Sequence, residues 1–274
     1  MKLFGPEIIA RSLSHAVPMG PSKTLWQYHS RSDRHSKITC WTVMFDLLRS
    51  SSLLRKQGAA GEVGFGINHC MADFKADRRK DLDLVVCRPA AESSDSKRIL
   101  ADFVDRWGII LSQEEKAELE ALPPFHECVV GAVEIALEAK ACMTEHNKAR
   151  PRLFDELNSS HLTIHGASNS AIASGFVMIN AAEHFQSPSR STLTRHKQPK
   201  AVEDVLEKVK QLPRRSSTTE TGYDSLAILV IDCANDGKSP VKVIEGPPSP
   251  GGIFSYGSSI QRMAHLYESR FPRA

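Results

Sequence analysis

Residues 128–142 read CVVGAVEIALEAKAC and form the clearest strand pattern in the chain. Successive side chains of a strand point to opposite faces. One face of this strand carries the apolar residues Val133, Ile135, Leu137 and Ala139, and the other carries Glu134, Ala136, Glu138 and Lys140. Because charged side chains in an otherwise apolar strand need partners, the pattern predicts a site at which Glu138 and Lys140 stand side by side.

The segments before this strand predict a helix, a hairpin and an insertion. Residues 1–35, which contain Pro6, Pro18, Gly20 and Pro21, are predicted to be an irregular arm. Apolar residues recur at three- and four-residue steps over 36–56, which predicts a helix with Ser36 as its N-cap. Alternation over 62–67 and the run LDLVVC at 82–87 predict a hairpin with the charged turn FKADRRKD at 74–81. Residues 88–127 are predicted to be a helical insertion, with helices at 97–107 and 112–122.

The segments after the strand alternate between helix and strand. Helices are predicted at 150–160, 201–212 and 258–270, buried strands at 171–180 and 226–232, and polar loops at 186–200 and 213–222. Pro151 is expected in the first turn of its helix, where a missing N–H costs little. This alternation predicts a single α/β domain over residues 1–274, with a mixed central β-sheet flanked by helices.

Composition excludes several classes of protein. Of the 274 residues, 41% are hydrophobic and 24% charged, which is ordinary globular usage and excludes a mainly disordered chain. No apolar run approaches the roughly 18–20 residues that a membrane helix needs. Pro6 and Glu7 lie where a secretory signal would need its apolar core. The six cysteines form no CxxC pair and are expected to be reduced thiols, so we expect a cytoplasmic protein with no membrane partner.

The net charge of +3 is distributed unevenly. Residues 1–57 contain nine Lys or Arg against three Asp or Glu. The 186–200 loop has no acidic residue, and its basic residues are Arg190, Arg195, Lys197 and Lys200. The basic residues that follow the strand at 128–142 are Lys148, Arg150 and Arg152. Such segments suit a polyanionic partner, although an ordinary solvated surface has the same composition.

A third charged residue, Asp83, lies in the apolar run KDLDLVV of the predicted hairpin. If the two strands are neighbours, Asp83, Glu138 and Lys140 converge at one point of the sheet. Two carboxylates with water can hold a hard divalent cation such as Mg²⁺, which lowers the pKa of bound water and screens the charge on a phosphate. The ammonium group of Lys140 can orient the attacking water or help to deprotonate it. This combination predicts phosphodiester hydrolysis.

Asp83 on an apolar strand, then Glu138-Ala139-Lys140 on another strand, then a helix, resembles the PD-(D/E)xK nuclease superfamily, which has the restriction-endonuclease-like fold. The resemblance covers about residues 36–232 in the order of elements, with Leu82 where the family name has Pro and 55 positions between Asp83 and Glu138. It implies an endonuclease that cleaves double-stranded DNA, with Asp83, Glu138 and Lys140 as catalytic residues and with Asp83 and Glu138 as ligands of Mg²⁺ or Mn²⁺. It also implies a homo-oligomer, because one site cuts one strand, and a role in restriction or other defence against foreign DNA, alone or with a separate subunit of a defence system.

Other assignments stay open. Asp81 lies on the same face as Asp83 and is an alternative ligand, and the candidates for an additional ligand are Asp46, Glu62 and Glu134. A structural ion pair between Glu138 and Lys140 on an edge strand would explain the same residues without catalysis. The chain would then be a non-catalytic nucleic-acid-binding or scaffolding protein that keeps the nuclease fold. A third interpretation is a hydrolase that acts on RNA or on another phosphate ester.

Overall fold

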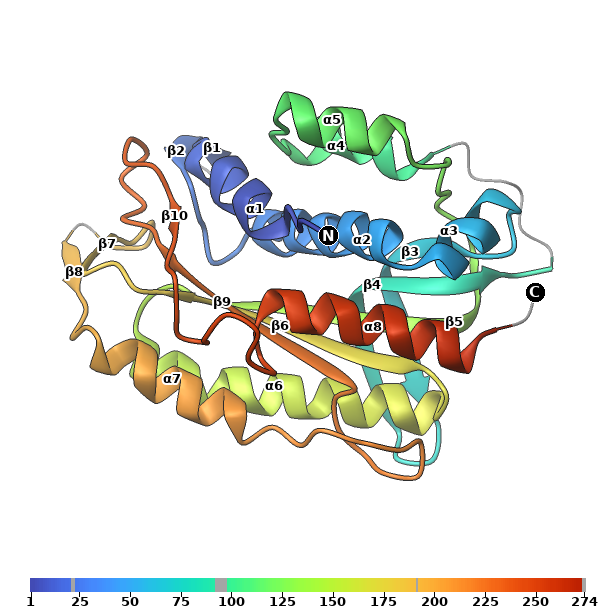
Figure 1. Cartoon of the computed structure of the whole chain (residues 1–274). Helices are drawn as coiled ribbons and strands as arrows, with labels where there is room; N and C mark the ends of the chain where they lie inside the picture. Colours follow the sequence, from blue (N-terminus) through green and yellow to red (C-terminus); the bar gives the residue numbers. More distant parts are fainter. Residues whose placement is uncertain (21–22, 92–97, 191, 273–274) are drawn as a thin grey trace.

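A six-stranded mixed β-sheet forms the centre of the chain in the computed structural model, which describes residues 1–20, 23–91, 98–190 and 192–272 (Figure 1). The strands lie in the order β10–β9–β6–β5–β4–β3. Their bounds are β3 (Gly64–Asp73), β4 (Arg78–Pro89), β5 (Val130–Cys142), β6 (Ile172–Asn180), β9 (Ser225–Asp232) and β10 (Lys242–Val243). Neighbours β5, β6 and β9 are parallel, whereas the β3–β4, β4–β5 and β9–β10 pairs are antiparallel. The predicted α/β class with a mixed sheet is therefore confirmed.

Helices cover both faces of this sheet (Figure 1). One face packs against α1 (Gly5–Ser14), α2 (Arg34–Ser50), α3 (Ser52–Ala59) and α8 (Tyr256–Arg270). The other face packs against α6 (His146–Ala167) and α7 (Lys200–Lys210). The side chains of α2 carry much of the first core, with Trp41 and Phe45 fully buried. Burying such a side chain contributes about 1.5–3 kcal/mol, so the apolar face of α2 holds this helix against β4 and β5.

Smaller elements lie around this core. They are the hairpin β1 (Val17–Met19) with β2 (Thr24–Trp26), the hairpin β7 (His184–Gln186) with β8 (Leu193–Arg195), the 3₁₀ turn Leu100–Asp102, α4 (Phe103–Trp107) and α5 (Gln113–Glu120). Helices α4 and α5 lie outside α2 in Figure 1. Both helices lie within the helical insertion predicted at 88–127, but Arg88 and Pro89 belong to β4, and α4 begins at Phe103; residues 92–97 lie outside the described ranges.

The structure of the N-terminal arm, residues 1–35, differs from the prediction. Residues 1–35 are predicted to be irregular, yet they contain α1 and the β1–β2 hairpin; residues 21–22 are outside the described part. Pro6 is compatible with the start of a helix, because the first N–H groups of a helix have no partner within it. The buried residues Ile8, Ile9 and Leu13 then share one helical face. The prolines in this arm therefore mark the ends of elements and not irregular chain.

The helix expected at 36–56 is two helices. The first of them, α2, begins at Arg34 with Asp33 as its N-cap, so the prediction of Ser36 as the cap is wrong. The break between α2 and α3 lies at Ser51. Ser51 has an extended backbone, and its hydroxyl accepts a hydrogen bond from the N–H of Leu54. The side chain of Ser51 thereby caps α3, which explains the break.

Three other boundaries differ from expectation. Residues Arg78 to Asp81 belong to β4 and not to the turn, and the 186–200 loop contains β8 and the end of β7, with position 191 outside the described residues. Helix α6 starts at His146, so Pro151 lies inside the helix. Pro151 is exposed, so the carbonyl of Asn147, which loses its helical partner there, can bind water instead.

Within the described ranges, no helix has both the length and the apolar character needed to cross a membrane.

Candidate active site

The candidate site lies where β4 and β5 stop pairing with each other. The ladder between the two strands runs from Pro89 opposite Val130 to Leu84 opposite Leu137, and Asp83 is the next residue of β4. The carboxylate Oδ2 of Asp83 accepts a hydrogen bond of 2.8 Å from the backbone N–H of Ala139. A side-chain oxygen thus takes the place of a backbone partner, and it anchors Asp83 to the residue between Glu138 and Lys140.

Glu138 is buried beside two lysines. Its side chain is 1% exposed, and its Oε1 lies 2.6 Å from Nζ of Lys140 and 3.5 Å from Nζ of Lys80. Its other oxygen, Oε2, has no hydrogen-bond partner among the described residues. An unsatisfied buried carboxylate oxygen is costly, so this atom marks a position at which a ligand would be stabilising.

The two carboxylates and the ammonium group influence one another. Burial raises the pKa of Asp83 above its ordinary value, although the Ala139 N–H and Lys140 act in the opposite direction. Burial and the charge of Asp83 both raise the pKa of Glu138, against the effect of Lys140. Burial lowers the pKa of Lys140, but the neighbouring carboxylates, Glu138 first, outweigh burial and raise it. Lys140 is therefore a cation at neutral pH, which argues against its acting as a base for the attacking water.

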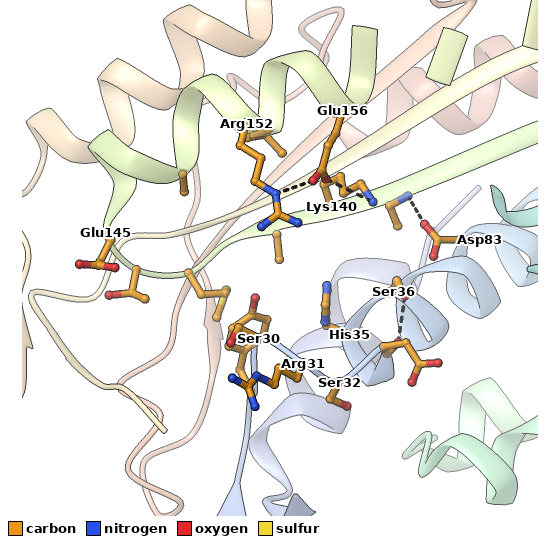
Figure 2. Close-up of a pocket in the computed structure, with 18 of the residues that line it drawn as sticks. Ser30, Arg31, Ser32, His35, Ser36, Asp83, Lys140, Glu145, Arg152 and Glu156 are labelled. Atoms are coloured by element: carbon orange, nitrogen blue, oxygen red, sulfur yellow. Dashed lines mark hydrogen bonds and ion pairs between the residues drawn. The ribbon is translucent and has the colours of Figure 1, made fainter. Parts of the chain in front are cut away.

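A cavity of about 650 Å³ opens beside these residues (Figure 2). Asp83 and Lys140 line it from the sheet, whereas buried Glu138 is not part of its lining. One wall comes from residues 28–36, between β2 and the first turn of α2, and the other from the N-terminal half of α6. Its charged lining residues are the acids Asp33, Asp83, Glu145 and Glu156 and the bases Arg31, Lys140, Lys148 and Arg152. A volume of this size is typical of small-ligand sites.

The structure therefore brings together the three residues that the sequence singled out, at a central strand. β5 lies between β4 and β6, so the interpretation of Glu138 and Lys140 as a pair on an edge strand is wrong. Helix α6 follows directly, and its Glu156 carries an Oε2 that lies 3.6 Å from Nζ of Lys140. Glu156 also pairs with Arg152 at 2.6 Å.

The four alternative acids lie elsewhere, and none of them lines this cavity, although all are in the described part of the chain. Asp46 is buried, accepts hydrogen bonds from the backbone N–H groups of Phe4 and Gly5, and pairs with Arg49, so it caps α1. Glu134 pairs with Arg88 and accepts from the hydroxyl of Tyr267. Asp81 is exposed and Glu62 is half-buried. Asp46 and Glu134 thus have structural partners.

Sequence reasoning missed the wall formed by residues 28–36. His35 belongs to this wall, and its ring lies 5.1 Å from that of Tyr28. Burial, and then the charge of Lys140, lower the pKa of His35 to about 4, so its imidazole is neutral at physiological pH. Nothing in the local pattern of 28–36 indicates this role, because the wall exists only once the chain folds. Glu156 carried a weak signal, since Arg152 four residues earlier predicts a helical ion pair.

A second cavity, of about 440 Å³, adjoins the first and shares Glu145 and Lys148 with it. It is lined by His146, His196 and the basic residues Arg195, Lys197 and Lys200 of the 186–200 segment. Several predicted basic residues have acidic partners: Lys200 and Arg150 pair with Asp204, and Arg190 pairs with Glu145. The two cavities adjoin each other at the N-terminal end of α6; acids and bases are balanced in the lining of the first, and bases are in excess in the lining of the second.

Among the described residues, no group of three or more His, Cys, Asp or Glu side chains is arranged to hold a metal ion. The site therefore offers two carboxylates, Asp83 and Glu138, a donor set that suits a hard cation whose remaining ligands are water. Comparison of the chain with protein-family profiles, with curated proteins and with solved structures gives no match.

Proposed function

We propose that this protein is a Mg²⁺- or Mn²⁺-dependent endonuclease that hydrolyses phosphodiester bonds of double-stranded DNA, in restriction or another defence against foreign DNA. The observation that carries the proposal is the hydrogen bond from the N–H of Ala139 to Asp83. It holds an acid of one strand against the Glu138-Ala139-Lys140 segment of the next. These are the residues that the resemblance to the PD-(D/E)xK superfamily implies.

The order of the elements supports a restriction-endonuclease-like fold. Helix α2 precedes the β3–β4 hairpin that carries Asp83; β5 carries Glu138 and Lys140; helix α6 and strand β6 follow. This is the order that the resemblance implies, and β6 is parallel to β5, as a helical connection between them requires.

The carboxylates fit a divalent cation. Glu138 has a buried oxygen without a hydrogen-bond partner in the described structure, and Asp83 has one oxygen held by Ala139. When bound, the cation would lower the pKa of a water molecule and neutralise charge on the phosphate. The backbone of β5 orients Asp83. Burial and the charge of Asp83 raise the pKa of Glu138, and Lys140 and Lys80 act in the opposite direction, as a bound cation would.

Lys140 acts as a cation in this proposal. Its raised pKa keeps the ammonium group protonated, and its side chain is 27% exposed, so it reaches the cavity. A fixed positive charge beside the scissile phosphate stabilises the negative charge that develops in the transition state. Its ion pairs with Glu138 and Glu156 fix the position of that charge.

The substrate is proposed to lie along the two cavities. Arg31, Lys148 and Arg152 in the first cavity, and Arg195, Lys197 and Lys200 in the second, are suited to phosphate groups of the DNA backbone. Since one site cuts one strand, cleavage of both strands requires a second copy, and a homo-oligomer is part of the proposal.

One observation favours a second candidate function, a non-catalytic nucleic-acid-binding protein. Glu138 does not line the cavity, and two lysines neutralise it. In such a protein, the charges of Asp83, Glu138 and Lys140 would only stabilise the place at which strands β4 and β5 stop pairing.

Incubation with supercoiled plasmid DNA separates the two functions. The nuclease nicks or linearises the plasmid with Mg²⁺ or Mn²⁺ and not with EDTA, and Glu138→Gln abolishes cleavage while binding to a labelled duplex in Ca²⁺ persists. Binding without cleavage under every metal condition would instead establish the non-catalytic protein. Parallel reactions with labelled RNA test whether DNA is the preferred substrate.

A further inference from the structure

Two cysteines lie close together near the C-terminal end of strand β4, away from the turn that joins β3 to β4. Cys87 belongs to β4, and Cys128 lies two residues before β5. Their sulfur atoms are 3.5 Å apart. A disulfide has sulfur atoms about 2.05 Å apart, so a movement of about 1.5 Å separates this contact from a bond.

The two sulfur atoms can come this close because the segment 126–130 crosses strand β3 at Gly64 and Gly66. The N–H of Cys128 donates to the carbonyl of Phe65, and the N–H of Phe65 donates to the carbonyl of His126. A Cβ atom at Gly64 would lie 2.8 Å from Sγ of Cys128, and a Cβ at Gly66 would lie 2.5 Å from Cγ2 of Val130. Such distances are shorter than real contacts. In the GEVGFG segment at 61–66, Gly64 therefore leaves the space in which Cys128 approaches Cys87, the register partner of Gly64, and Gly66 leaves space for Val130.

The two thiols differ in access and acidity. Cys87 has no exposed surface, whereas Cys128 is half-buried. The thiol contact between them raises the pKa of Cys87 and lowers that of Cys128, against the effects of burial and Glu127 on Cys128. A lowered pKa and partial exposure are what a reactive cysteine needs, so Cys128 is the attacking thiol and Cys87 the resolving one.

We propose that Cys87 and Cys128 are an oxidation site that a peroxide converts into an intramolecular disulfide. The thiolate of Cys128 attacks one peroxide oxygen; an S–O bond forms, the O–O bond breaks, and the leaving hydroxide takes up a proton as water. The sulfur of Cys87 then attacks the sulfenic acid of Cys128; the S–S bond forms, the S–O bond breaks, and the thiol proton of Cys87 leaves with the hydroxide as a second water. Two cysteines are oxidised, and one peroxide is reduced to two waters.

The bond would close a loop around the helical insertion. Cys87 and Cys128 are 41 positions apart, and α4 and α5 lie between them. A cross-link of this span restricts the unfolded chain and stabilises the folded one. It would also tie the start of β5 to β4, four residues beyond Asp83. This proposal does not depend on the nuclease function.

Peptide mapping of the folded wild-type protein tests the bond directly. After treatment with hydrogen peroxide and alkylation of the remaining thiols, trypsin should release residues 81–97 linked to residues 117–140, two hydrogen atoms lighter than the separate peptides. The reductant dithiothreitol should reverse this change, and the melting temperature of the oxidised protein should be several degrees higher. Separate alkylated peptides for both cysteines after peroxide treatment would overturn the proposal.

Variants then assign the roles of the two thiols. In a Cys70→Ser background, which removes the exposed thiol, Cys87→Ser should leave Cys128 as a sulfenic acid that dimedone labels. Cys128→Ser should leave Cys87 unmodified, because Cys87 is buried. Cys142→Ser, at a separate buried cysteine, should form the disulfide as the wild type does. Equal dimedone labelling of Cys128 in the Cys87→Ser variant and of Cys87 in the Cys128→Ser variant, both in the Cys70→Ser background, would contradict the assigned order of attack.

Discussion

The carboxylate of Asp83 on β4 accepts a 2.8 Å hydrogen bond from the backbone N–H of Ala139 on β5. This bond joins two parts of the chain that are 56 positions apart, and it does so through a main-chain group. A main-chain donor cannot change rotamer, so the position of Asp83 is set by the register of the two strands. A shift of one residue in that register would turn Glu138 and Lys140 to the opposite face of the sheet.

Asp83→Asn should reduce cleavage on the order of 100-fold or more, because the amide removes a charge that the proposed cation needs while its oxygen can still accept from Ala139. The melting temperature should change by only a few degrees. The matched control is Asp81→Asn, at an exposed acid two residues earlier on β4 that does not line the cavity. Cleavage rates across a Mg²⁺ titration check this prediction. Loss of activity in Asp81→Asn with normal activity in Asp83→Asn would identify Asp81 as the ligand.

Lys140→Met should abolish cleavage but preserve DNA binding measured in Ca²⁺, because the ammonium group is proposed to stabilise the transition state and not the bound duplex. Lys80→Met is the matched control. Lys80 also pairs with Glu138, at 3.5 Å, but it does not line the cavity. Lys80→Met should therefore retain most of the activity, measured as the single-turnover rate. Equal losses in the two variants would show that the lysines act only by neutralising Glu138.

Replacement of Arg190, Arg195, Lys197 and Lys200 together by Ala should weaken binding to all DNA sequences about equally. The slope of log affinity against log salt concentration should flatten by roughly one for each phosphate that the variant no longer neutralises, because fewer counterions are released. The control replaces Lys56, Lys116, Lys210 and Lys242, which lie away from this cluster, by Ala. Binding isotherms at several salt concentrations decide the question. Identical slopes for the two quadruple variants would mean that the cluster is only solvated surface.

The alternation in VEIALEAK does not predict the face of Val133, which packs with Ala136 and not with Ile135, because the β4–β5 ladder shifts register beside it. The period-two pattern is nevertheless enough to predict the strand and the adjacency of Glu138 and Lys140. It is enough because a strand buried on both sides tolerates charged residues only where they have partners. Both features depend on a local pattern, which is visible in sequence. The position of Asp83 beside Ala139 does not follow from such a pattern, because β4 pairs with β5 across the insertion at 88–127.

Features that depend on tertiary contacts are not predictable in this way. Residues 28–36 form a wall of the cavity only because α2 packs against β5, and nothing in their own sequence indicates this. Asp46 is a candidate ligand from sequence, yet its partners are backbone N–H groups of α1, an element that the sequence pattern does not predict. The purpose of Gly64 and Gly66 appears only when segment 126–130 is seen to cross them.

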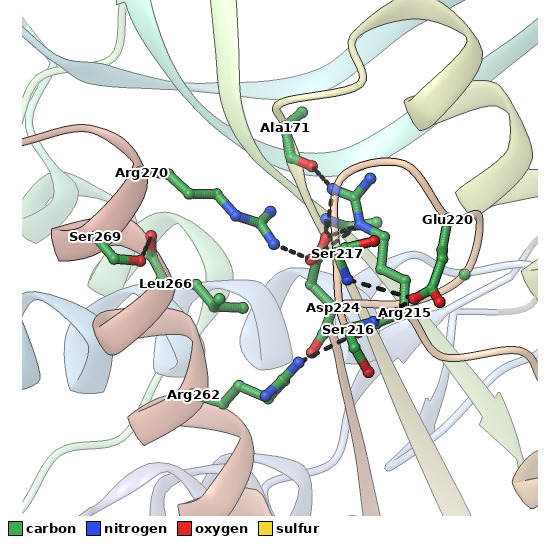
Figure 3. A network of polar contacts seen from close by, with 12 residues as sticks. Ala171, Arg215, Ser216, Ser217, Glu220, Asp224, Arg262, Leu266, Ser269 and Arg270 are labelled. Atoms are coloured by element: carbon green, nitrogen blue, oxygen red, sulfur yellow. Dashed lines mark hydrogen bonds and ion pairs between the residues drawn. The ribbon is translucent and has the colours of Figure 1, made fainter.

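Asp224 provides a test of stability that is independent of function. This fully buried carboxylate, next to β9, lies among three arginines (Figure 3). Arg215 and Arg270 contact its side chain at 2.9 and 2.5 Å, and Arg262 donates to its backbone carbonyl. Burial raises the pKa of Asp224, but the hydrogen bonds from Arg215 and Arg270 outweigh burial and lower it below the ordinary value.

Because the folded-state pKa of Asp224 is depressed, its contribution to stability is complete above about pH 4, the unfolded value, and disappears as the pH falls through the folded pKa. Asp224→Asn should reduce the free energy of unfolding by about 3–5 kcal/mol at neutral pH, since it leaves the buried guanidinium of Arg215 without its counter-charge. The difference from wild type should shrink in acid. Urea unfolding at neutral pH and at about pH 3 measures both quantities.

The control variant is Asp232→Asn, at an exposed position at the end of β9, which should change the free energy of unfolding by no more than about 0.5 kcal/mol. A difference between Asp224→Asn and wild type that stays constant with pH would show that the carboxylate stabilises the fold through its hydrogen bonds and not through its charge.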